Sequence, residues 1–249
     1  MRKFGLIGFP LSHSFSEKYF TEKFQRENIT DATFQNFPIE SIDRLPELLK
    51  ANPELCGLSV TIPYKEKVIP FLNEIDPVAK EIGAVNCINI SQLHSPNSQL
   101  KGFNTDVYGF RQSLKPFLAS HHERALILGT GGASKAVEYV LREIGIDCLF
   151  VSRERKNGNV VTYSELNNYI IDSHKLIVNC SPVGTFPNVN DAPQIPYEFI
   201  TKDHFLYDLV YNPAETLFLK HGKEKGAMTL NGFDMLKFQA EKAWDIWNS

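Results

Sequence analysis

The chain has 249 residues, enough for one large domain or two small ones with a sizeable core. Its 26 basic and 29 acidic residues give a net charge of −3, which argues against binding to nucleic acid or to an anionic membrane surface. No apolar run approaches the roughly 18 residues of a membrane-spanning helix. The apolar start is broken by Gly8 and Pro10 without a signal-peptide cleavage site, so it is predicted to be a strand ending in a turn.

The first hundred residues alternate apolar runs with amphipathic segments, an order typical of a mostly parallel sheet with helices on its faces. Strands are predicted over residues 3–7, 33–38, 57–61 and 84–90. Helices are predicted over residues 16–27, 45–51 and 76–82. A polar segment over residues 91–99 is predicted to be a loop, and a helix over residues 107–117 to link the two halves.

The strongest local pattern opens the second half. An apolar strand over residues 125–128 runs directly into Gly129, Gly131 and Gly132, and a helix is predicted over residues 133–141. Such glycines let the backbone approach a pyrophosphate, and the helix N-terminus presents free N–H groups to its charge. The pattern therefore predicts dinucleotide binding, and the alternative is a tight turn in a protein that binds no nucleotide.

The remaining elements continue the alternation of strand and helix. Strands are predicted over residues 147–151, 176–179 and 205–208. Residues 181–196 contain several prolines and are predicted to be a loop, whereas residues 233–247 form the last helix. The predicted fold class is therefore α/β throughout.

The end of the strand after the glycines selects the cofactor. Enzymes that use NAD often place a carboxylate there for the ribose 2′-hydroxyl, but this chain has Ser152, followed by Arg153, Arg155 and Lys156. A guanidinium pairs well with a phosphate, so this end of the strand favours NADP. Glu154 weakens that preference, and the alternative is a solvated charged loop.

Polar residues also gather at predicted strand ends in the first half. Thr61 and Lys65 close one strand, Asn86 lies in the next, and Asp106 precedes the linking helix. A lysine and a carboxylate that face one pocket can share and move a proton, and hydroxyls and amides suit a substrate rich in hydroxyl groups. Taken alone, a lysine such as Lys65 is normally a solvated surface cation.

The cysteines and histidines give no metal-binding pattern. None of Cys56, Cys87, Cys148 and Cys180 forms a C-x-x-C pair, so buried reduced thiols in a cytosolic protein are expected. His121 and His122 are adjacent, but no other His or Cys lies at ligand spacing. We therefore expect no metal.

Eight short segments, in order along the chain, resemble those of shikimate dehydrogenases. They cover residues 8–16, 60–65, 83–86, 104–106, 125–137, 179–184, 207–213 and 235–239. The resemblance implies a cytoplasmic, NADP-dependent enzyme of aromatic amino-acid (chorismate) biosynthesis that reversibly reduces 3-dehydroshikimate to shikimate. It implies a substrate domain over residues 1–105 that is completed by residues 232–249. A Rossmann-like NADP-binding domain then spans residues 106–231.

The resemblance also implies roles for individual residues. The catalytic pair is Lys65 and Asp106. Substrate-binding residues are Ser14, Ser16, Thr61, Asn86, Tyr211 and Gln239. Cofactor-binding residues are Gly129, Gly131, Gly132, Ala133, Ser152, Arg153, Gly232 and Met235. Ser152 and Glu154 depart from the family's usual Asn and Thr around the arginine, which leaves the cofactor preference less certain than the reaction.

Two other functions stay open. One is a quinate or shikimate dehydrogenase that uses NAD or NADP, because Ser14 and Ser16 suit either carboxylate. The other is a non-catalytic NADP-binding regulatory module, which we expect to have lost Lys65 or Asp106. The oligomeric state, monomer or homodimer, is not determined by the sequence.

Overall fold

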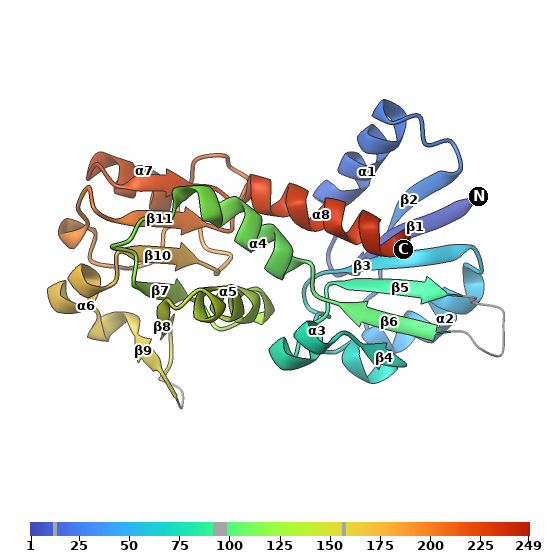
Figure 1. The fold of residues 1–249 in the computed structure, drawn as a ribbon, viewed down its shortest axis with the longest axis horizontal. Coiled ribbons are helices and arrows are strands. Elements are labelled where there is room, and N and C mark those ends of the chain that lie inside the picture. Colours follow the sequence, from blue (N-terminus) through green and yellow to red (C-terminus); the bar gives the residue numbers. More distant parts are fainter. Residues whose placement is uncertain (12–13, 92–98, 156–157) are drawn as a thin grey trace. The chain divides into compact units, whose positions relative to one another are not determined.

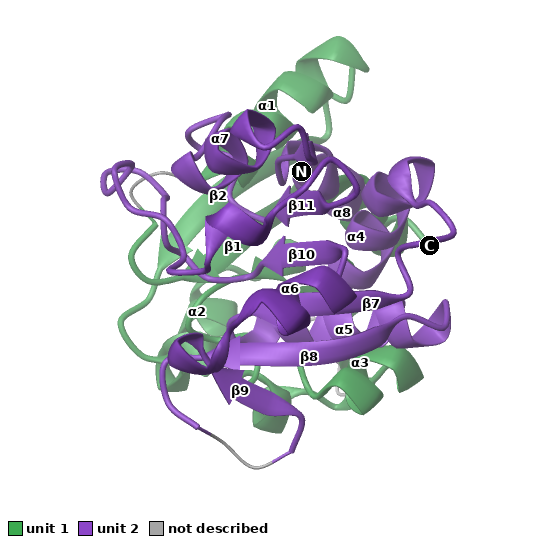
Figure 2. Ribbon diagram, turned by 90° about the vertical axis from the view of Figure 1, so that its left-hand side faces the viewer, with its two compact units in different colours: residues 1–105, 240–249 green, residues 106–239 purple. Residues whose placement is uncertain are grey.

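The protein is described by a computed structural model covering residues 1–11, 14–91, 99–155 and 158–249. These residues form two compact units, Met1–Thr105 with Ala240–Ser249 (unit 1) and Asp106–Gln239 (unit 2), coloured separately in Figure 2. Three sequence predictions fall on residues outside this description: His13 of the first segment, most of the loop over residues 91–99, and Lys156.

Unit 1 is built on a six-stranded sheet in the order β2-β1-β3-β5-β6-β4 (Figure 1). The strands are β1 (Arg2–Gly8), β2 (Ala32–Pro38), β3 (Leu55–Val60), β4 (Glu74–Ile75), β5 (Cys87–Ser91) and β6 (Gln99–Phe103). The helices are α1 (Phe15–Arg26), α2 (Leu45–Ala51) and α3 (Pro77–Ile82). Strand β1 pairs parallel with β2 and β3, whereas β5 pairs antiparallel with β3 and β6. Residues 84–86 were predicted to begin a strand, but β5 begins only at Cys87. The Val85 N–H instead donates to the Lys65 carbonyl in the turn after β3.

Unit 2 contains a fully parallel six-stranded sheet in the order β12-β11-β10-β7-β8-β9. The strands are β7 (Arg124–Leu128), β8 (Asp147–Ser152), β9 (Val160–Thr162), β10 (Leu176–Asn179), β11 (Phe205–Asp208) and β12 (Met228–Leu230). The helices are α4 (Asp106–Leu114), α5 (Gly132–Glu143), α6 (Asn168–Ser173), α7 (Leu217–Glu224) and α8 (Phe233–Trp247), whose last residues belong to unit 1. From β9 to β12 the strands follow the 3-2-1-4-5-6 order of a Rossmann fold, which confirms the predicted fold class.

The end of α8 closes the core of unit 1. The Trp247 ring stacks on Phe4 with centroids 5.0 Å apart, and its Nε1–H donates to the Ile88 carbonyl at 3.0 Å. A Cβ added to Gly57 of β3 would lie 2.3 Å from two atoms of this ring. Gly57 therefore leaves the space in which the indole packs against the sheet.

A buried lysine joins α8 to α1 within the same unit. Lys23 is 4% exposed, and its Nζ lies 2.7 Å from the Glu241 carboxylate and 3.0 Å from that of Glu27. The Tyr19 hydroxyl also hydrogen-bonds to Glu241. Burial, followed by this bond to Glu241, raises the pKa of Tyr19, so it stays a neutral donor. Two carboxylates therefore pair with the buried Lys23 ammonium, and this pairing offsets the free-energy cost of burying its charge.

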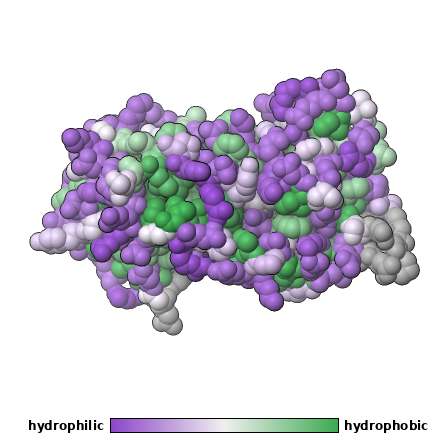
Figure 3. Space-filling view, viewed as in Figure 1, coloured by the Kyte–Doolittle hydropathy of each residue, from purple (hydrophilic) through white to green (hydrophobic). Residues whose placement is uncertain are grey.

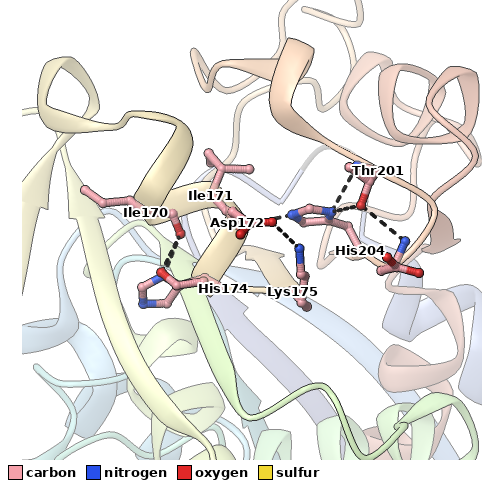
Figure 4. Close-up of polar contacts among 9 residues, drawn as sticks. Ile170, Ile171, Asp172, His174, Lys175, Thr201 and His204 are labelled. Carbon is pink, nitrogen blue, oxygen red and sulfur yellow. Dashed lines mark hydrogen bonds and ion pairs between the residues drawn. The ribbon is translucent and has the colours of Figure 1, made fainter.

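Two histidines are buried near the beginning of β7 and β11. The Nδ1 atom of His204 accepts from the Thr201 backbone N–H, so its Nε2 carries the proton that is donated to the Ile171 carbonyl (Figure 4). His122 likewise accepts the Ala119 N–H at Nδ1. Burial lowers the pKa of His204, and burial lowers that of His122 to about 4. Both rings are therefore neutral, and the Nδ1 atom of each accepts a backbone N–H.

The surface is mainly polar. Figure 3 shows hydrophilic side chains over most of one face, with hydrophobic ones in separate patches. Among the residues that the structure describes, no helix is both long and apolar enough to span a bilayer. The four cysteines are free thiols, but only Cys87 is buried as predicted, and the other three are half-buried.

Replacing Gly57 with alanine is expected to lower the free energy of unfolding by about 1–3 kcal/mol, the usual cost of overpacking. The cause is the 2.3 Å approach of the new Cβ to the Trp247 ring. Urea denaturation measures the loss. In a Trp247→Ala background the same change should cost much less, so the two substitutions should couple in a double-mutant cycle. Strictly additive losses would contradict this account.

The second prediction concerns acid stability. The unfolded chain protonates His122 near pH 6.5, whereas the folded protein does so only near pH 4. The unfolded state therefore binds more protons in this window, and stability must fall as pH falls through it. His122→Asn, whose Oδ1 can accept the same N–H, should show a shallower loss between pH 6.5 and 4 in thermal unfolding. Identical pH profiles for the two proteins would exclude His122 as the source.

Candidate functional site

The turn after β3 carries the first two candidate residues. Thr61 directly follows β3, and its N–H donates to the Ile7 carbonyl of β1 at 2.9 Å. The Tyr64 N–H then donates to the Thr61 carbonyl at 2.9 Å, while the buried Tyr64 hydroxyl donates to Ile39. This anchored turn places Lys65, which is half-buried, at the carboxyl end of β3.

The segment before β5 lies against this turn. The Val85 N–H donates to the Lys65 carbonyl at 2.7 Å, and the Val60 N–H donates to the Asn86 carbonyl at 2.8 Å. Asn86 is 4% exposed. Thr61 and Lys65, which the sequence placed at the end of one strand, and Asn86, which it placed in the next, are therefore neighbours in unit 1.

The Asn86 amide is oriented by a residue that sequence reasoning missed. Its Oδ1 accepts from the Thr105 N–H at 2.6 Å and from the Thr105 hydroxyl at 3.2 Å. These two donors fix the oxygen edge of the amide, so its nitrogen edge must face the other way. Thr105 lies between Asn104 and Asp106 in one of the eight segments. This position was the only signal in the sequence that could have indicated its role.

Ser14 and Ser16 lie at the start of α1. Ser14 occupies the N-cap position, yet its hydroxyl makes no capping bond. Its Oγ is buried and has no hydrogen-bond partner among the described residues, and Ser16 is 8% exposed. An unpaired buried hydroxyl costs free energy, so its position is suited to a polar ligand group.

The glycine turn has the geometry of an anion site. Gly129 has φ of +110°, and a Cβ there would lie 3.4 Å from the Cys180 carbonyl carbon. Gly131, the N-cap of α5, is exposed, and a Cβ there would meet nothing within 4 Å. Ser134, at the third glycine position, is fully buried and bonds back to the Gly131 carbonyl at 2.7 Å. With Gly132 and Ala133, the open backbone and helix N-terminus fit a pyrophosphate.

The cations after β8 differ in their partners. Arg155 is ion-paired with Glu165, which also accepts from the N–H and the hydroxyl of Thr162 at 2.7 and 2.9 Å. Arg153 is exposed and makes no ion pair with any described residue. Arg153 directly follows Ser152, the last residue of β8, and its role toward a ribose phosphate stays a prediction.

Helices α4 and α8 approach closely in unit 2. A Cβ added to Gly109 would lie 2.5 Å from the Met235 carbonyl and 3.1 Å from Gln239 Cβ. Asp106, which is 6% exposed, lies one turn before Gly109 on the same face of α4. Gly109, on the face of α4 that carries Asp106, therefore packs against the face of α8 that carries Met235 and Gln239.

The start of α8 packs against the segment that carries Tyr211. A Cβ added to Gly232 would lie 2.1 Å from the Leu209 carbonyl, and the Gly232 N–H donates to the Val210 carbonyl at 3.2 Å. Tyr211 is half-buried, and burial raises the pKa of its phenol. Gly232, Met235 and Tyr211 therefore come from one packed region of unit 2.

The two units divide the predicted catalytic pair. Lys65 belongs to unit 1 and Asp106 to unit 2, so their pairing stays a prediction. Within the described parts of the chain, no group of three His, Cys, Asp or Glu side chains could hold a metal ion.

The chain resembles known proteins along its full length. The family model described as shikimate dehydrogenase substrate binding domain matches residues 6–88. A shikimate dehydrogenase (NADP(+)) of Carboxydothermus hydrogenoformans is 39% identical and covers 98% of this chain and 90% of its own.

Two solved structures agree with this. Shikimate 5-dehydrogenase of Thermus thermophilus, in complex with NADP(H) and shikimate, has a TM-score of 0.86 at 29% identity, over 99% of this chain and 93% of that one. Quinate dehydrogenase of Corynebacterium glutamicum, in complex with NAD, has a TM-score of 0.85 at 26% identity, with the same coverage of both chains. The eight segments are thus part of a similarity that runs through both units, and the chain belongs to the shikimate dehydrogenase family.

Proposed function

We propose that this protein is an NADP-dependent shikimate dehydrogenase that reversibly reduces 3-dehydroshikimate to shikimate. The observation that carries the proposal is the 39% identity, over nearly the whole chain, to a relative named for this activity. Both residues of the proposed catalytic pair, Lys65 and Asp106, are present, which argues against a non-catalytic regulatory module.

The cofactor would be held by unit 2. Gly129, Gly131, Gly132 and Ala133 would contact the pyrophosphate, and Ser152 and Arg153 the phosphorylated ribose. Gly232 and Met235 would lie near the nicotinamide. When bound, NADPH supplies the hydride, and the protein supplies orientation and charge.

The substrate would be held mainly by hydroxyl and amide groups. Ser14 and Ser16 would bind the carboxylate, and the unpartnered Ser14 hydroxyl suits this role. Thr61, Asn86 and Gln239 would bind ring hydroxyls, and Tyr211 would lie beside them. Because Thr105 fixes the Asn86 oxygen, the amide nitrogen would be the donor offered to the substrate.

Lys65 would act as the general acid of the reduction. Its ammonium donates a proton to the C3 oxygen as that oxygen becomes an alkoxide, and its charge stabilises the alkoxide beforehand. Asp106 would orient Lys65 and accept a hydrogen bond from the product hydroxyl. In the oxidation direction, Lys65 takes the same proton back.

Quinate is the second candidate substrate, because the chain also matches a quinate dehydrogenase structure with a TM-score of 0.85. The test incubates purified protein with shikimate or quinate, each with NADP+ or NAD+, and follows reduced-cofactor absorbance. Turnover of shikimate with NADP+ well above the other three pairs supports the proposal. Faster turnover of quinate, or no turnover at all, would overturn it.

A cytoplasmic location and the oligomeric state stay predictions.

The structure offers a matched pair for the cofactor test. Arg153→Ala should weaken NADP+ binding by roughly 1.5–3 kcal/mol, the scale of a hydrogen bond to a charged group. Arg155→Ala should change it little, because Arg155 is paired with Glu165. Calorimetric titration with NADP+ and NAD+ measures both variants. Equal losses for NADP+ and NAD+ in Arg153→Ala would show that this arginine does not recognise the 2′-phosphate.

The catalytic pair gives a further prediction. Lys65→Ala should lower turnover by roughly 10²–10⁴-fold, as expected for a lost general acid. Asp106→Ala should also reduce turnover severely, and the double variant should be little worse than the worse single one. The exposed Lys67 serves as control, since Lys67→Ala should keep normal turnover. Near-normal turnover of folded Lys65→Ala protein would refute the mechanism.

A further inference from the structure

Asp208 is a buried carboxylate that the proposed mechanism does not use. It ends β11 and is fully buried. No lysine, arginine or histidine pairs with it in the part of the chain that the structure describes. A carboxylate in such a place must be held by hydrogen bonds.

Three donors hold this carboxylate, one at the end of β10 and two in the segment between β11 and α7. Its Oδ1 accepts from Asn179 Nδ2 at 2.9 Å and from the Val210 N–H at 3.0 Å. Its Oδ2 accepts from the Thr216 hydroxyl at 2.6 Å. Thr216 is also the N-cap of α7, where it accepts the Leu219 N–H.

Each donor fixes a loop at the carboxyl end of the sheet. The Asn179 oxygen accepts from both the N–H and the hydroxyl of Ser181, at 3.0 and 2.6 Å, which shapes the loop after β10. Val210 lies in the segment that leads to Tyr211, and its carbonyl accepts the Gly232 N–H at the start of α8. Asp208 therefore connects the loop after β10, the loop after β11 and the beginning of α8.

These loops adjoin the glycine turn. The sheet register aligns Leu128 of β7 with Asn179 of β10, and Asn179 with Asp208 of β11. The Cys180 N–H donates to the Leu128 carbonyl at 2.9 Å, and the Gly129 backbone packs against Cys180.

The strand order of unit 2 indicates over which strands each half of a bound dinucleotide would lie. The pyrophosphate turn follows β7, and the ribose-phosphate residues Ser152 and Arg153 follow β8, on one side of β7. The other half of the cofactor must then extend over β10 and β11, because ligands bind along the carboxyl ends of such strands.

We propose that Asp208 is a positioning residue that holds the loops after β10 and β11 in the shape that receives the nicotinamide half of NADP. The inference rests on the proposed function, and it adds a residue that contacts neither cofactor nor substrate.

The pKa of this carboxyl gives its contribution to stability a pH dependence. Burial raises the pKa of Asp208 to about 6 against the hydrogen bonds from Thr216, Val210 and Asn179, which lower it. A carboxyl whose pKa rises from 3.8 on folding gives a contribution to stability that is complete below pH 3.8 and is lost as pH rises through about 6. At pH 8, where the carboxyl is ionised, this contribution is absent.

The titratable side chains that sense this carboxylate are the Cys180 thiol and the Tyr197 phenol. Burial first, and then the charge of Asp208, raises the pKa of each, so both stay neutral near pH 8. Neither compensates the charge. Protonation of Asp208 at Oδ2 below pH 6 would turn that oxygen into a donor, so the Thr216 hydroxyl would have to accept and would lose the acceptor of its own proton.

The test compares Asp208→Asn with Asp203→Asn, an exposed aspartate just before β11. At pH 8, Asp208→Asn should keep or raise the melting temperature, because it removes a buried charge. Its amide nitrogen nevertheless donates where Oδ2 accepted, so the Thr216 hydroxyl must turn to accept and loses the acceptor of its own proton. We therefore expect NADP+ affinity, measured calorimetrically, to fall by about 5- to 50-fold. The KM for NADP+ should rise, and that for shikimate should change little. Asp203→Asn should match the unmodified protein in every measurement.

The pH profile gives a second readout. NADP+ affinity of the unmodified protein should decline toward that of Asp208→Asn as pH falls through about 6. A phosphate group also gains a proton near this pH. The quantity to compare is therefore the difference in NADP+ affinity between the unmodified protein and Asp208→Asn at each pH.

The failures are distinguishable. A lower melting temperature together with raised KM values for both NADP+ and shikimate in Asp208→Asn would show that Asp208 is merely structural, and this would overturn the proposal. Unchanged NADP+ affinity in the variant, with normal binding by the unmodified protein, would overturn it alone. Absence of NADP+ binding by the unmodified protein would overturn the proposed function as well.

Discussion

The packing of the Trp247 indole against Gly57 is the contact on which unit 1 depends most. It joins the last turn of the chain to the middle of the first sheet, where Phe4 and Ile88 complete its surroundings. The strands beneath it end in the turn that carries Thr61 and Lys65. A side chain at Gly57 would displace the ring, so the backbone of one strand residue determines whether the C-terminal helix can close this core.

Unit 2 is organised by a different constraint, the in-register ends of parallel strands. Leu128, Asn179 and Asp208 end three neighbouring strands at one level, so their loops leave the sheet side by side. Such loops need internal partners because their backbone groups no longer belong to the sheet. The Asp208 carboxylate supplies acceptors for two of them, the loops after β10 and β11, at a cost in burial, which is a pattern expected where geometry for a ligand matters more than stability.

The last helix, α2, β10 and β11 match their predictions at both ends. Strands β9 and β12 have three residues each, too few for a period to emerge. Helix α7 was not predicted from the sequence, and it contains Gly222 in its interior. In the fold a Cβ at Gly222 would lie 2.6 Å from Leu206, so the glycine is needed for packing.

The sequence by itself determined the glycine turn, the order of the eight segments and hence the family, because these features are local or depend only on order along the chain. The tertiary structure alone decided which arginine after β8 is already paired, which atom of Asn86 is occupied by Thr105, and that Asp208 joins the loops after β10 and β11. Each of these contacts brings together residues from separate segments. Their proximity follows from strand order and register, which no spacing in the sequence expresses.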